Sequence, residues 1–330
     1  MDEGPCQMVV WMNAGEPHTR GELELIRRIR ALLEPAEARD GSPRWRGGLG
    51  FGDDMAPLEP DDPGLLWTVD MLMDGVDFDS AKHDWQAVGW KALAVNLSDC
   101  AAMAATPVAA LCAVALSERL SLQAALDLVA GVAACGRRYG CPLVGGDTNS
   151  WGAPTAISIS VAGRCEPGCG PVRRDGARSG DGIWLTGPVG GSILGRHMTF
   201  EPRLAVAREI ARTLRPHAMI DISDGLALDL TRILEASGCG AVLAQSALDA
   251  AIHPDAHRLA ERDGIPARTH ALQDGEDFEL IVVLPADAPP ERCAAAGLLP
   301  LGQVVSEGGL LLDTPGGRTP IAPAGWEHFT

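Results

Sequence analysis

The sequence predicts a mixed α/β protein of the α+β class, built as two domains. Three observations support this. The 330 residues exceed one small domain and fit two domains of ordinary size. Apolar residues follow helical spacing in some stretches and form short strand-like runs in others, in both halves of the chain. A segment rich in glycine, proline and arginine, residues 164–182, separates the two halves and predicts a domain boundary.

The N-terminal end is expected to contribute little to the core. Residues 1–20 show no periodicity, and we interpret them as a loose extension. They do not resemble a signal peptide, because acidic residues precede a short apolar patch and no basic start is present. Residues 21–34 place leucine and isoleucine at helical spacing and predict an amphipathic helix, with which an N-terminal domain of residues 21–165 begins.

The rest of this N-terminal domain alternates between expected strands and helices. Ser121 is expected to cap the second helix, and Gly140 to end it. The expected strands are residues 64–73, 107–117, 141–149 and 155–163, and the expected helices are residues 84–105 and 121–139.

The C-terminal domain, residues 166–330, is predicted to have the same mixed character. One of its helices should bury a side formed by Leu226, Leu230, Ile233 and Leu234. The expected strands are residues 183–187, 218–223 and 278–285, and the expected helices are residues 201–215 and 224–238.

Composition restricts the partners and the compartment. The 44 acidic residues outnumber 27 lysines and arginines, which gives a formal charge of −17 and argues against binding to a nucleic-acid backbone. No apolar run reaches the roughly 20 residues that cross a bilayer. Nine cysteines without a CxxC pair indicate free thiols rather than a zinc site or a disulfide framework. We therefore expect a cytoplasmic protein without nucleic-acid or membrane partners.

Acidic residues recur at the ends of apolar segments. Each one alone is ambiguous, because aspartate commonly caps a helix or forms a turn. Together they predict a cluster whose mutual repulsion needs compensation by bound cations. With oxygen ligands and no interleaved histidine or cysteine, the pattern favours Mg²⁺ or Ca²⁺ over zinc. The motifs are "GDDMA" (52–56), "TVD" (68–70), "NLSD" (96–99), "GGDT" (145–148), "DISD" (221–224) and "GEDFE" (275–279).

Carboxylate-held Mg²⁺ is typical of phosphoryl transfer, in which metal ions neutralise charge on nucleotide oxygens. The sequence lacks both the GxxxxGK[ST] phosphate loop and the glycine-rich loop of protein kinases. A nucleotide would then be held through metal ions and backbone amides, and "GGD" at 145–147 is one place where the backbone could approach a phosphate.

These motifs carry a resemblance to a known family. The chain resembles the thiamine-monophosphate kinases, in the superfamily of aminoimidazole ribonucleotide synthetase and selenophosphate synthetase. The similarity spans about residues 23–329 and follows the family order. It rests on "GDDMA", "TVDMLMDGVDF", "GWKALAVNLSDCAAMAATP", "VGGDTN", "RRDGARSGD", "AMIDISDGLALDL", "DGEDFELIV" and "GWEHF".

The resemblance implies ATP-dependent phosphorylation of thiamine monophosphate to thiamine diphosphate, with several Mg²⁺ ions. It implies a homodimer whose N-terminal sheets form a barrel, and a C-terminal domain that covers the cleft. The implied Mg²⁺ ligands are Asp53, Thr68, Val69, Asp70, Asp99, Asp147, Asp221 and Asp224. The implied ATP contacts are Gly146, Asp147, Arg174 and Ser223, and the implied substrate-side positions are Asp77, Glu276 and Trp326.

Three positions depart from the family pattern or lack a role in it. Asp77 stands where the family usually has histidine, and His83 or Lys82 could supply the missing positive charge. Val129 stands near the position of an adenine-stacking aromatic residue, and Tyr139 lies too far along the helix to replace it. Asp229, one turn beyond Asp224, is expected to be a solvated helix position.

Two alternatives remain open at this point. One is another ATP-using enzyme of the superfamily, although Cys6 lacks the glycine-rich loop typical of selenophosphate synthetase. The C-terminal "GWEHFT" also differs from the terminal cysteine of the hydrogenase-maturation member. The other alternative is a non-catalytic nucleotide- or metal-binding homologue, which the changes at Asp77 and Val129 would permit.

Overall fold

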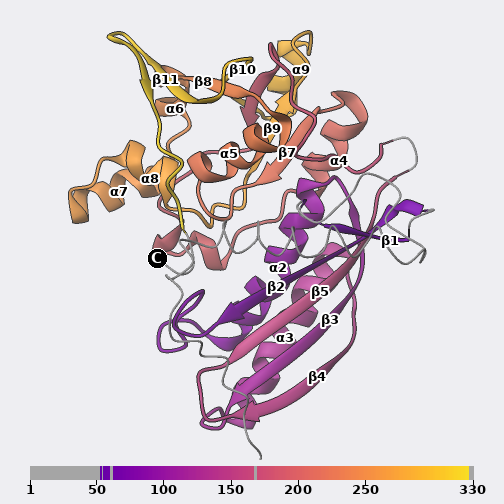
Figure 1. The fold of residues 1–330 in the computed structure, drawn as a ribbon. Helices are drawn as coiled ribbons and strands as arrows, with labels where there is room; N and C mark the ends of the chain where they lie inside the picture. Colours follow the sequence, from indigo (N-terminus) through magenta and orange to yellow (C-terminus); the bar gives the residue numbers. More distant parts are fainter. Residues whose placement is uncertain (1–52, 54, 60–61, 167–168, 327–330) are drawn as a thin grey trace, which may run out of the picture. The chain divides into compact units, whose positions relative to one another are not determined.

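A computed structural model describes residues 53, 55–59, 62–166 and 169–326. All of these belong to one compact unit, which contains two β-sheets with helices (Figure 1). The expected extension at residues 1–20 and the expected helix at residues 21–34 lie outside the described residues.

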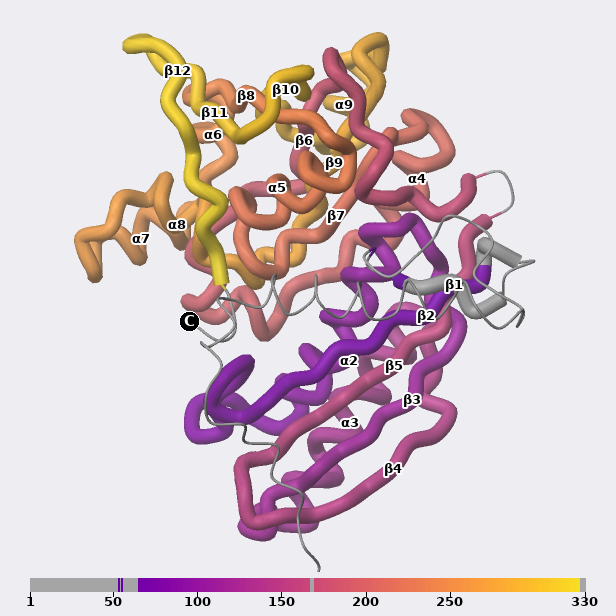
Figure 2. The backbone as a smooth tube through the Cα atoms, in the orientation of Figure 1, coloured from indigo at the N-terminus to yellow at the C-terminus, as the bar shows by residue number. Residues whose placement is uncertain are grey.

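The first sheet has the strand order β1-β2-β5-β3-β4, and its long strands lie side by side in Figure 2. Neighbouring strands in this sheet run antiparallel, except for β3 and β4, which run parallel. Its strands are β1 (Ala56–Glu59), β2 (Asp62–Met73), β3 (Thr106–Ser117), β4 (Leu143–Trp151) and β5 (Ala156–Arg164).

Two helices, α2 (Trp85–Ala102) and α3 (Leu122–Tyr139), accompany this sheet, and α2 contacts β2, β3 and β5. Asp84 and Ser121 cap the two helices by accepting backbone N–H bonds with their side chains. The helices approach closely, because a Cβ on Gly89 would lie 1.9 Å from the carbonyl oxygen of Leu128. A Cβ on Gly131 would likewise lie 2.0 Å from the carbonyl oxygen of Gln86.

The two faces of the sheet differ in character. Leu66 and Leu72 on β2 are buried, as are Ile157 and Ile159 on β5, which pairs with β2. The alternate residues of β2 point the other way, and the side chains of Val69 and Met71 are 62% and 59% exposed. Val108, Leu111 and Val144, on β3 and β4, are also exposed large apolar residues.

The second sheet has the order β12-β11-β8-β10-β6-β9-β7. Strand β9, which lies next to the edge strand β7, is fully apolar and buried along its length. The strands are β6 (Gly182–Leu185), β7 (Ala218–Asp221), β8 (Gly240–Ala244), β9 (Leu280–Leu284), β10 (Leu299–Val305), β11 (Gly309–Thr314) and β12 (Gly317–Pro320).

Helix α2 also packs against the C-terminal half, where it contacts α4, β7 and η2. One apolar core therefore contains Leu93 and Leu97 of α2 together with Leu204 and Ile210 of α4. The remaining helices are η1 (Ser192–Leu194), η2 (Arg196–Met198), α4 (Leu204–Thr213), α5 (Leu226–Ser237), α6 (Gln245–Ala250), α7 (Pro254–Asp263), α8 (Ala267–Gln273) and α9 (Pro290–Ala295).

The mixed α/β class is confirmed, and the expected strands and helices between residues 64 and 285 are present with ends shifted by a few residues. The strands of the first sheet end at Arg164, and those of the second begin at Gly182. The domain boundary between 165 and 166 stays a prediction. Strands β8 and β10–β12 and helices α6–α9 were not anticipated. None of the described helices is long and apolar enough to cross a membrane.

Candidate active site

The predicted acidic residues begin to converge where β2, α2 and β7 meet. The hydroxyl of Thr68, on β2, donates a hydrogen bond to the carboxylate of Asp99 on α2. The neighbouring Ser98 donates to Asp221 at the end of β7, with 2.6 Å between the two oxygens. Burial raises the pKa of the Cys100 thiol, and Asp99 and Asp70 add to this rise, so both carboxylates lie near that thiol. Four of the predicted metal-side positions therefore share one junction.

The turn after β7 carries Asp224, whose carboxylate forms an ion pair with Arg232 of α5. Asp229 supports this turn, because its Oδ2 accepts the backbone N–H groups of Asp224 and Gly225 at 3.0 Å. Its Oδ1 accepts from Arg232 at 2.7 Å. The expectation of a solvated Asp229 was wrong: the side chain is 0% exposed, and burial raises its pKa. The signal missed was a carboxylate that folds back onto the N-terminus of its own helix.

Residues 274–279, which we call the acidic loop, lie against the same turn. The backbone N–H of Glu276 donates to the carbonyl of Ser223 at 2.7 Å, and that of Phe278 donates to the carbonyl of Ile222 at 2.9 Å. Glu276 and Phe278 both adopt positive φ angles of 51°, which non-glycine residues seldom do. Such a conformation persists only where surrounding contacts hold it.

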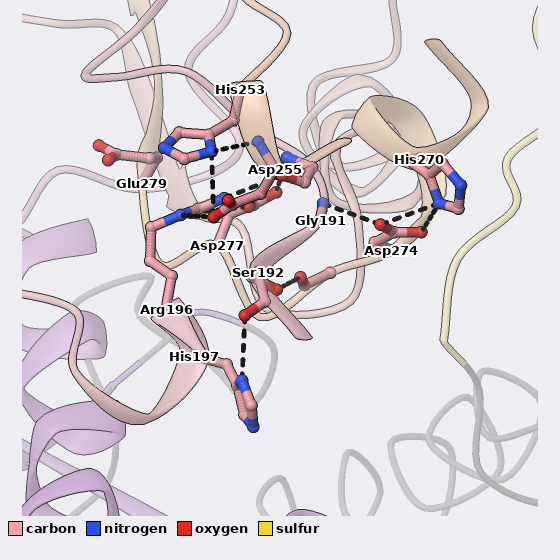
Figure 3. A network of polar contacts seen from close by, with 12 residues as sticks. Gly191, Ser192, Arg196, His197, His253, Asp255, His270, Asp274, Asp277 and Glu279 are labelled. Carbon is pink, nitrogen blue, oxygen red and sulfur yellow. Dashed lines mark hydrogen bonds and ion pairs between the residues drawn. The ribbon is translucent and has the colours of Figure 1, made fainter. Parts of the chain in front are cut away.

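Those contacts come from residues 190–196 (Figure 3). The carboxylate of Asp277 accepts from the Gly190 N–H at 2.9 Å and pairs with Arg196 at 3.0 Å. Asp274 accepts from the Gly191 N–H at 2.8 Å. Burial raises the pKa of Asp277 to about 7, although Arg196 opposes this rise. These acids hold the acidic loop and occupy the glycine N–H groups that could otherwise bind an anion.

Glu276 also pairs with a residue that sequence reasoning did not identify. The ammonium group of Lys91, on α2, forms an ion pair with the Glu276 carboxylate. The same ammonium donates to the backbone carbonyl of Asp77 at 2.6 Å. Burial raises the pKa of Glu276, and Lys91 opposes this rise. The structure thus brings two of the three substrate-side positions together, and the third, Trp326, donates its backbone N–H to the carbonyl of Asp224 at 2.8 Å.

Asp53 and Arg174 are also neighbours. The Oδ1 of Asp53 accepts the backbone N–H of Arg174 at 3.1 Å, and its Oδ2 lies 3.7 Å from the guanidinium of Arg173. Arg174 lowers the pKa of Asp229 slightly against the larger effect of burial, so its charge lies near the Asp224 turn.

Gly146 and Asp147 lie apart from this junction, on the edge strand β4. Asp70, Ile159, Cys112 and Gly146 form one row across the sheet, so three strand spacings, about 14 Å, separate Asp70 from Gly146. Asp147 is aligned with Ala113, on the exposed side of the sheet. A Cβ on Gly146 would lie 1.9 Å from the carbonyl oxygen of Cys112, so the close pairing of β3 and β4 itself requires this glycine.

The positions that depart from the family pattern have identifiable surroundings. The Asp77 carboxylate accepts the backbone N–H of Met73 at 2.7 Å. Lys82 forms a surface ion pair with Asp79, whereas the ring of His83 packs edge-on against His197 at 5.5 Å. Burial lowers the pKa of His197 to about 4.

The nucleotide-side departures differ in their surroundings. Val129 is an exposed residue of α3. Tyr139 packs against Trp90, with 6.1 Å between the ring centroids.

The donor set has the chemistry that Mg²⁺ prefers, since carboxylate and hydroxyl oxygens predominate. Among the described residues, no three acids, histidines or cysteines stand close enough to hold an ion as they are. Asp224 is held by Arg232, and Asp53 by Arg173, so both must exchange arginine contacts for an ion to bind there. The residues fit the ion by type, after rearrangement of those side chains.

Comparison with known proteins places this site in context. Residues 52–165 match the family model described as AIR synthase related protein, N-terminal domain. The chain is 41% identical over 249 residues to a thiamine-monophosphate kinase from Rhodopirellula baltica, covering 73% of this chain and 77% of that one. A thiamine-monophosphate kinase from Synechococcus elongatus is 34% identical over 94% of this chain and 97% of its own length.

A solved structure gives the same result in three dimensions. The structure of AaThiL complexed with AMPPCP and TMP superimposes with a TM-score of 0.79 at 29% identity, covering 94% of this chain and 97% of that one. On the identity to the Rhodopirellula baltica protein and the extent of the match, this chain belongs to the thiamine-monophosphate kinase family.

Proposed function

We propose that this protein transfers the γ-phosphoryl group of ATP to thiamine monophosphate and so forms thiamine diphosphate and ADP. The observation that carries the proposal is the junction of β2, α2, β7 and α5, where Thr68, Asp99 and Asp221 meet. The relatives named as thiamine-monophosphate kinases, and the related structure with AMPPCP and TMP, support the same activity. ATP is then a co-substrate, and we propose a cytoplasmic location, where ATP is available.

The proposed Mg²⁺ ions would be held by Asp53, Thr68, the backbone of Val69, Asp70, Asp99, Asp221 and Asp224, and Asp147, which lies apart on β4, would contact a separate ion. When bound, such ions neutralise charge on the phosphoryl oxygens as it develops. Other residues of the chain orient the carboxylate oxygens that would bind these ions. Asp229 and Arg232 hold the Asp224 turn, and Ser98 holds the Asp221 carboxylate. On the nucleotide side we assign Gly146, Asp147, Arg174 and Ser223.

The substrate side is assigned to Asp77, Glu276 and Trp326. Asp77 and Glu276 are joined through Lys91, and Trp326 is joined to the Asp224 turn. A phosphate monoester beside Asp77 would be repelled unless a cation stands between them. The Lys91 ammonium, 2.6 Å from the backbone carbonyl of Asp77, is one such cation, and the proposed metal ions are others.

The test of the activity is a product assay with competing acceptors. Purified protein with ATP and Mg²⁺ is expected to convert thiamine monophosphate to thiamine diphosphate. Selenide and formylglycinamidine ribonucleotide, acceptors for other chemistry of the superfamily, are expected to cause no consumption of ATP above background. Turnover of either one in preference to thiamine monophosphate would support the alternative enzyme, and ATP binding without any turnover would support the non-catalytic homologue.

We further propose that the protein is a homodimer in which the first sheets of two copies form a barrel, with the C-terminal half covering each active site. The exposed apolar residues of this sheet face support this proposal, since Val69 and Met71 lie two residues apart on the same face of β2. Apolar patches of this kind usually mark an interface.

This assembly predicts a mass of about 70 kDa in sedimentation, twice the 34.6 kDa of one chain. Met71→Asp places a charge on the proposed interface and is expected to shift the protein to the single-chain mass. Leu126→Asp is the matched control, because Leu126 is an exposed apolar residue on α3 rather than on the sheet. A wild-type protein that sediments only as a single chain at micromolar concentration would contradict the dimer.

Asp77→His restores the residue that the family usually has at this position. We expect activity to be kept or raised, with the main change a lower apparent KM for thiamine monophosphate, because a carboxylate near the phosphate is removed. The backbone carbonyl that Lys91 contacts is unaffected by the exchange. Steady-state kinetics with each substrate varied in turn measure the effect. Complete loss of activity in a folded variant would mean that the Asp77 carboxylate itself is required.

A further inference from the structure

Lys91 is an unusual residue in this chain. Of the 27 lysines and arginines, only Lys82 and Lys91 are lysines. Lys82 lies on the surface, whereas the side chain of Lys91 is 0% exposed. Burial of an ammonium group is unfavourable unless fixed acceptors surround it. A buried lysine in a chain that otherwise uses arginine for positive charge indicates a specific requirement at this position.

The acceptors of Lys91 come from two distant segments. One is the backbone carbonyl of Asp77, in the connection between β2 and α2, and the other is the carboxylate of Glu276 in the acidic loop. Glu276 lies 185 residues further along the chain. An ammonium group is a compact charge that can donate in separate directions, whereas a guanidinium is a planar fork suited to one carboxylate. Lysine therefore suits a position between a carbonyl and a carboxylate.

Glu276 also contacts the turn that carries Asp224. Its backbone N–H donates to Ser223, and the Cβ that Gly275 lacks would lie 2.6 Å from the same Ser223 carbonyl oxygen. The place of Glu276 thus determines how the acidic loop lies against Ser223 and Asp224. Through Lys91, helix α2 contacts the loop that borders this turn.

The acidic loop has a second, separate attachment. Asp274, Gly275 and Asp277 bond to Gly191, Ser192 and Gly190 within the C-terminal half (Figure 3). Loss of Lys91 leaves these bonds in place. The loop should therefore keep its conformation within the C-terminal half but lose its fixed position relative to α2 and Asp77. Such a change affects alignment of the site more than folding.

We propose that Lys91 is a positioning residue that aligns the acidic loop with the Asp77 segment and so determines affinity for thiamine monophosphate. The role in affinity rests on the proposed function, whereas the alignment of the loop does not. Lys91 acts through Glu276 and the Asp77 backbone, and these contacts do not reach Gly146 and Asp147 on β4. Of the nucleotide-side residues, Ser223 is bonded to Glu276, but only through backbone groups. Loss of Lys91 should therefore raise the KM for thiamine monophosphate more than the KM for ATP.

The first test is steady-state kinetics of Lys91→Met. The apparent KM for thiamine monophosphate is expected to rise about tenfold or more, the effect of losing one charge-assisted hydrogen bond. The KM for ATP should rise less than the KM for thiamine monophosphate, because Glu276 contacts the ATP-side residue Ser223 only through its backbone N–H, which the exchange leaves in place. Arg208→Met is the matched control, because Arg208 joins α4 to Thr106 of β3 through a long cationic side chain outside the site. Equal increases in both KM values for Lys91→Met would contradict the positioning role.

The second test does not depend on activity. Backbone hydrogen exchange of residues 274–279 is expected to accelerate in Lys91→Met and to stay unchanged in Arg208→Met. If Lys91→Met does not fold, the same exchange measurement is made on the double variant Lys91→Met/Glu276→Met, in which both buried charges are removed. Unchanged exchange in this loop would overturn the proposal. If the wild-type protein forms no thiamine diphosphate but Lys91→Met still exchanges faster than wild type in residues 274–279, the alignment is supported and only the proposed function is contradicted.

Discussion

Asp99→Asn is expected to lower phosphoryl transfer by several orders of magnitude while leaving the metal-free protein as stable as wild type, or slightly more stable. The exchange keeps the size of the side chain and an oxygen that can accept from Thr68. It removes one negative charge from the junction with Asp70 and Asp221, which relieves repulsion when no metal ion is bound. It also removes a carboxylate from the proposed metal ligands, on which charge stabilisation in this chemistry depends.

The measurement is turnover together with the metal-free melting temperature of the same preparation. Excess Mg²⁺ should restore turnover only in part. Asp127→Asn is the control, because the Asp127 carboxylate contacts Gln123 within α3, away from the junction. A variant of Asp99 that melts well below wild type but keeps full turnover would show that Asp99 is a structural residue.

Asp229→Ala is expected to be the most destabilising of the substitutions considered. The carboxylate accepts two backbone N–H groups and pairs with Arg232, all within a fully buried position. Alanine would leave these donors without an acceptor and the guanidinium without one of its carboxylates. Removing one partner of a buried ion pair typically costs about 3–5 kcal/mol.

The free energy of unfolding in urea measures this loss of stability, and Asp249→Ala is the reference variant. Asp249 pairs with Arg268 through two hydrogen bonds, but both side chains are partly exposed, and such pairs contribute about 1 kcal/mol or less. If the two variants lose equal stability, Asp229 does not support the Asp224 turn in the way described.

Sequence patterns predicted the long elements well, for physical reasons. The strand at residues 64–73 is a nearly continuous apolar run, and the helices at residues 84–105 and 121–139 are capped by Asp84 and Ser121, which are local signals. Apart from β9, the short strands after residue 238 lack such signals. For example, β8 is the five-residue run Gly240–Ala244, too short to show a period.

The candidate site was predictable by residue type and less so by contact. The sequence placed Asp99 and Asp221 at the ends of apolar segments, and the structure joins them to Thr68 and Ser98. Asp229 was misjudged because a helix position one turn beyond a cap can face either solvent or the cap itself. Lys91 was missed because its partners are set by tertiary packing, 185 residues away in one case.

Direct phosphoryl transfer from ATP to thiamine monophosphate can be followed with ATP labelled in its γ-phosphate. The labelled ATP is incubated with thiamine monophosphate, Mg²⁺ and wild-type protein, and the products are separated. Label is expected in the terminal phosphate of thiamine diphosphate, in a one-to-one ratio with ADP. Label found only in inorganic phosphate, or ADP formed without thiamine diphosphate, would contradict it.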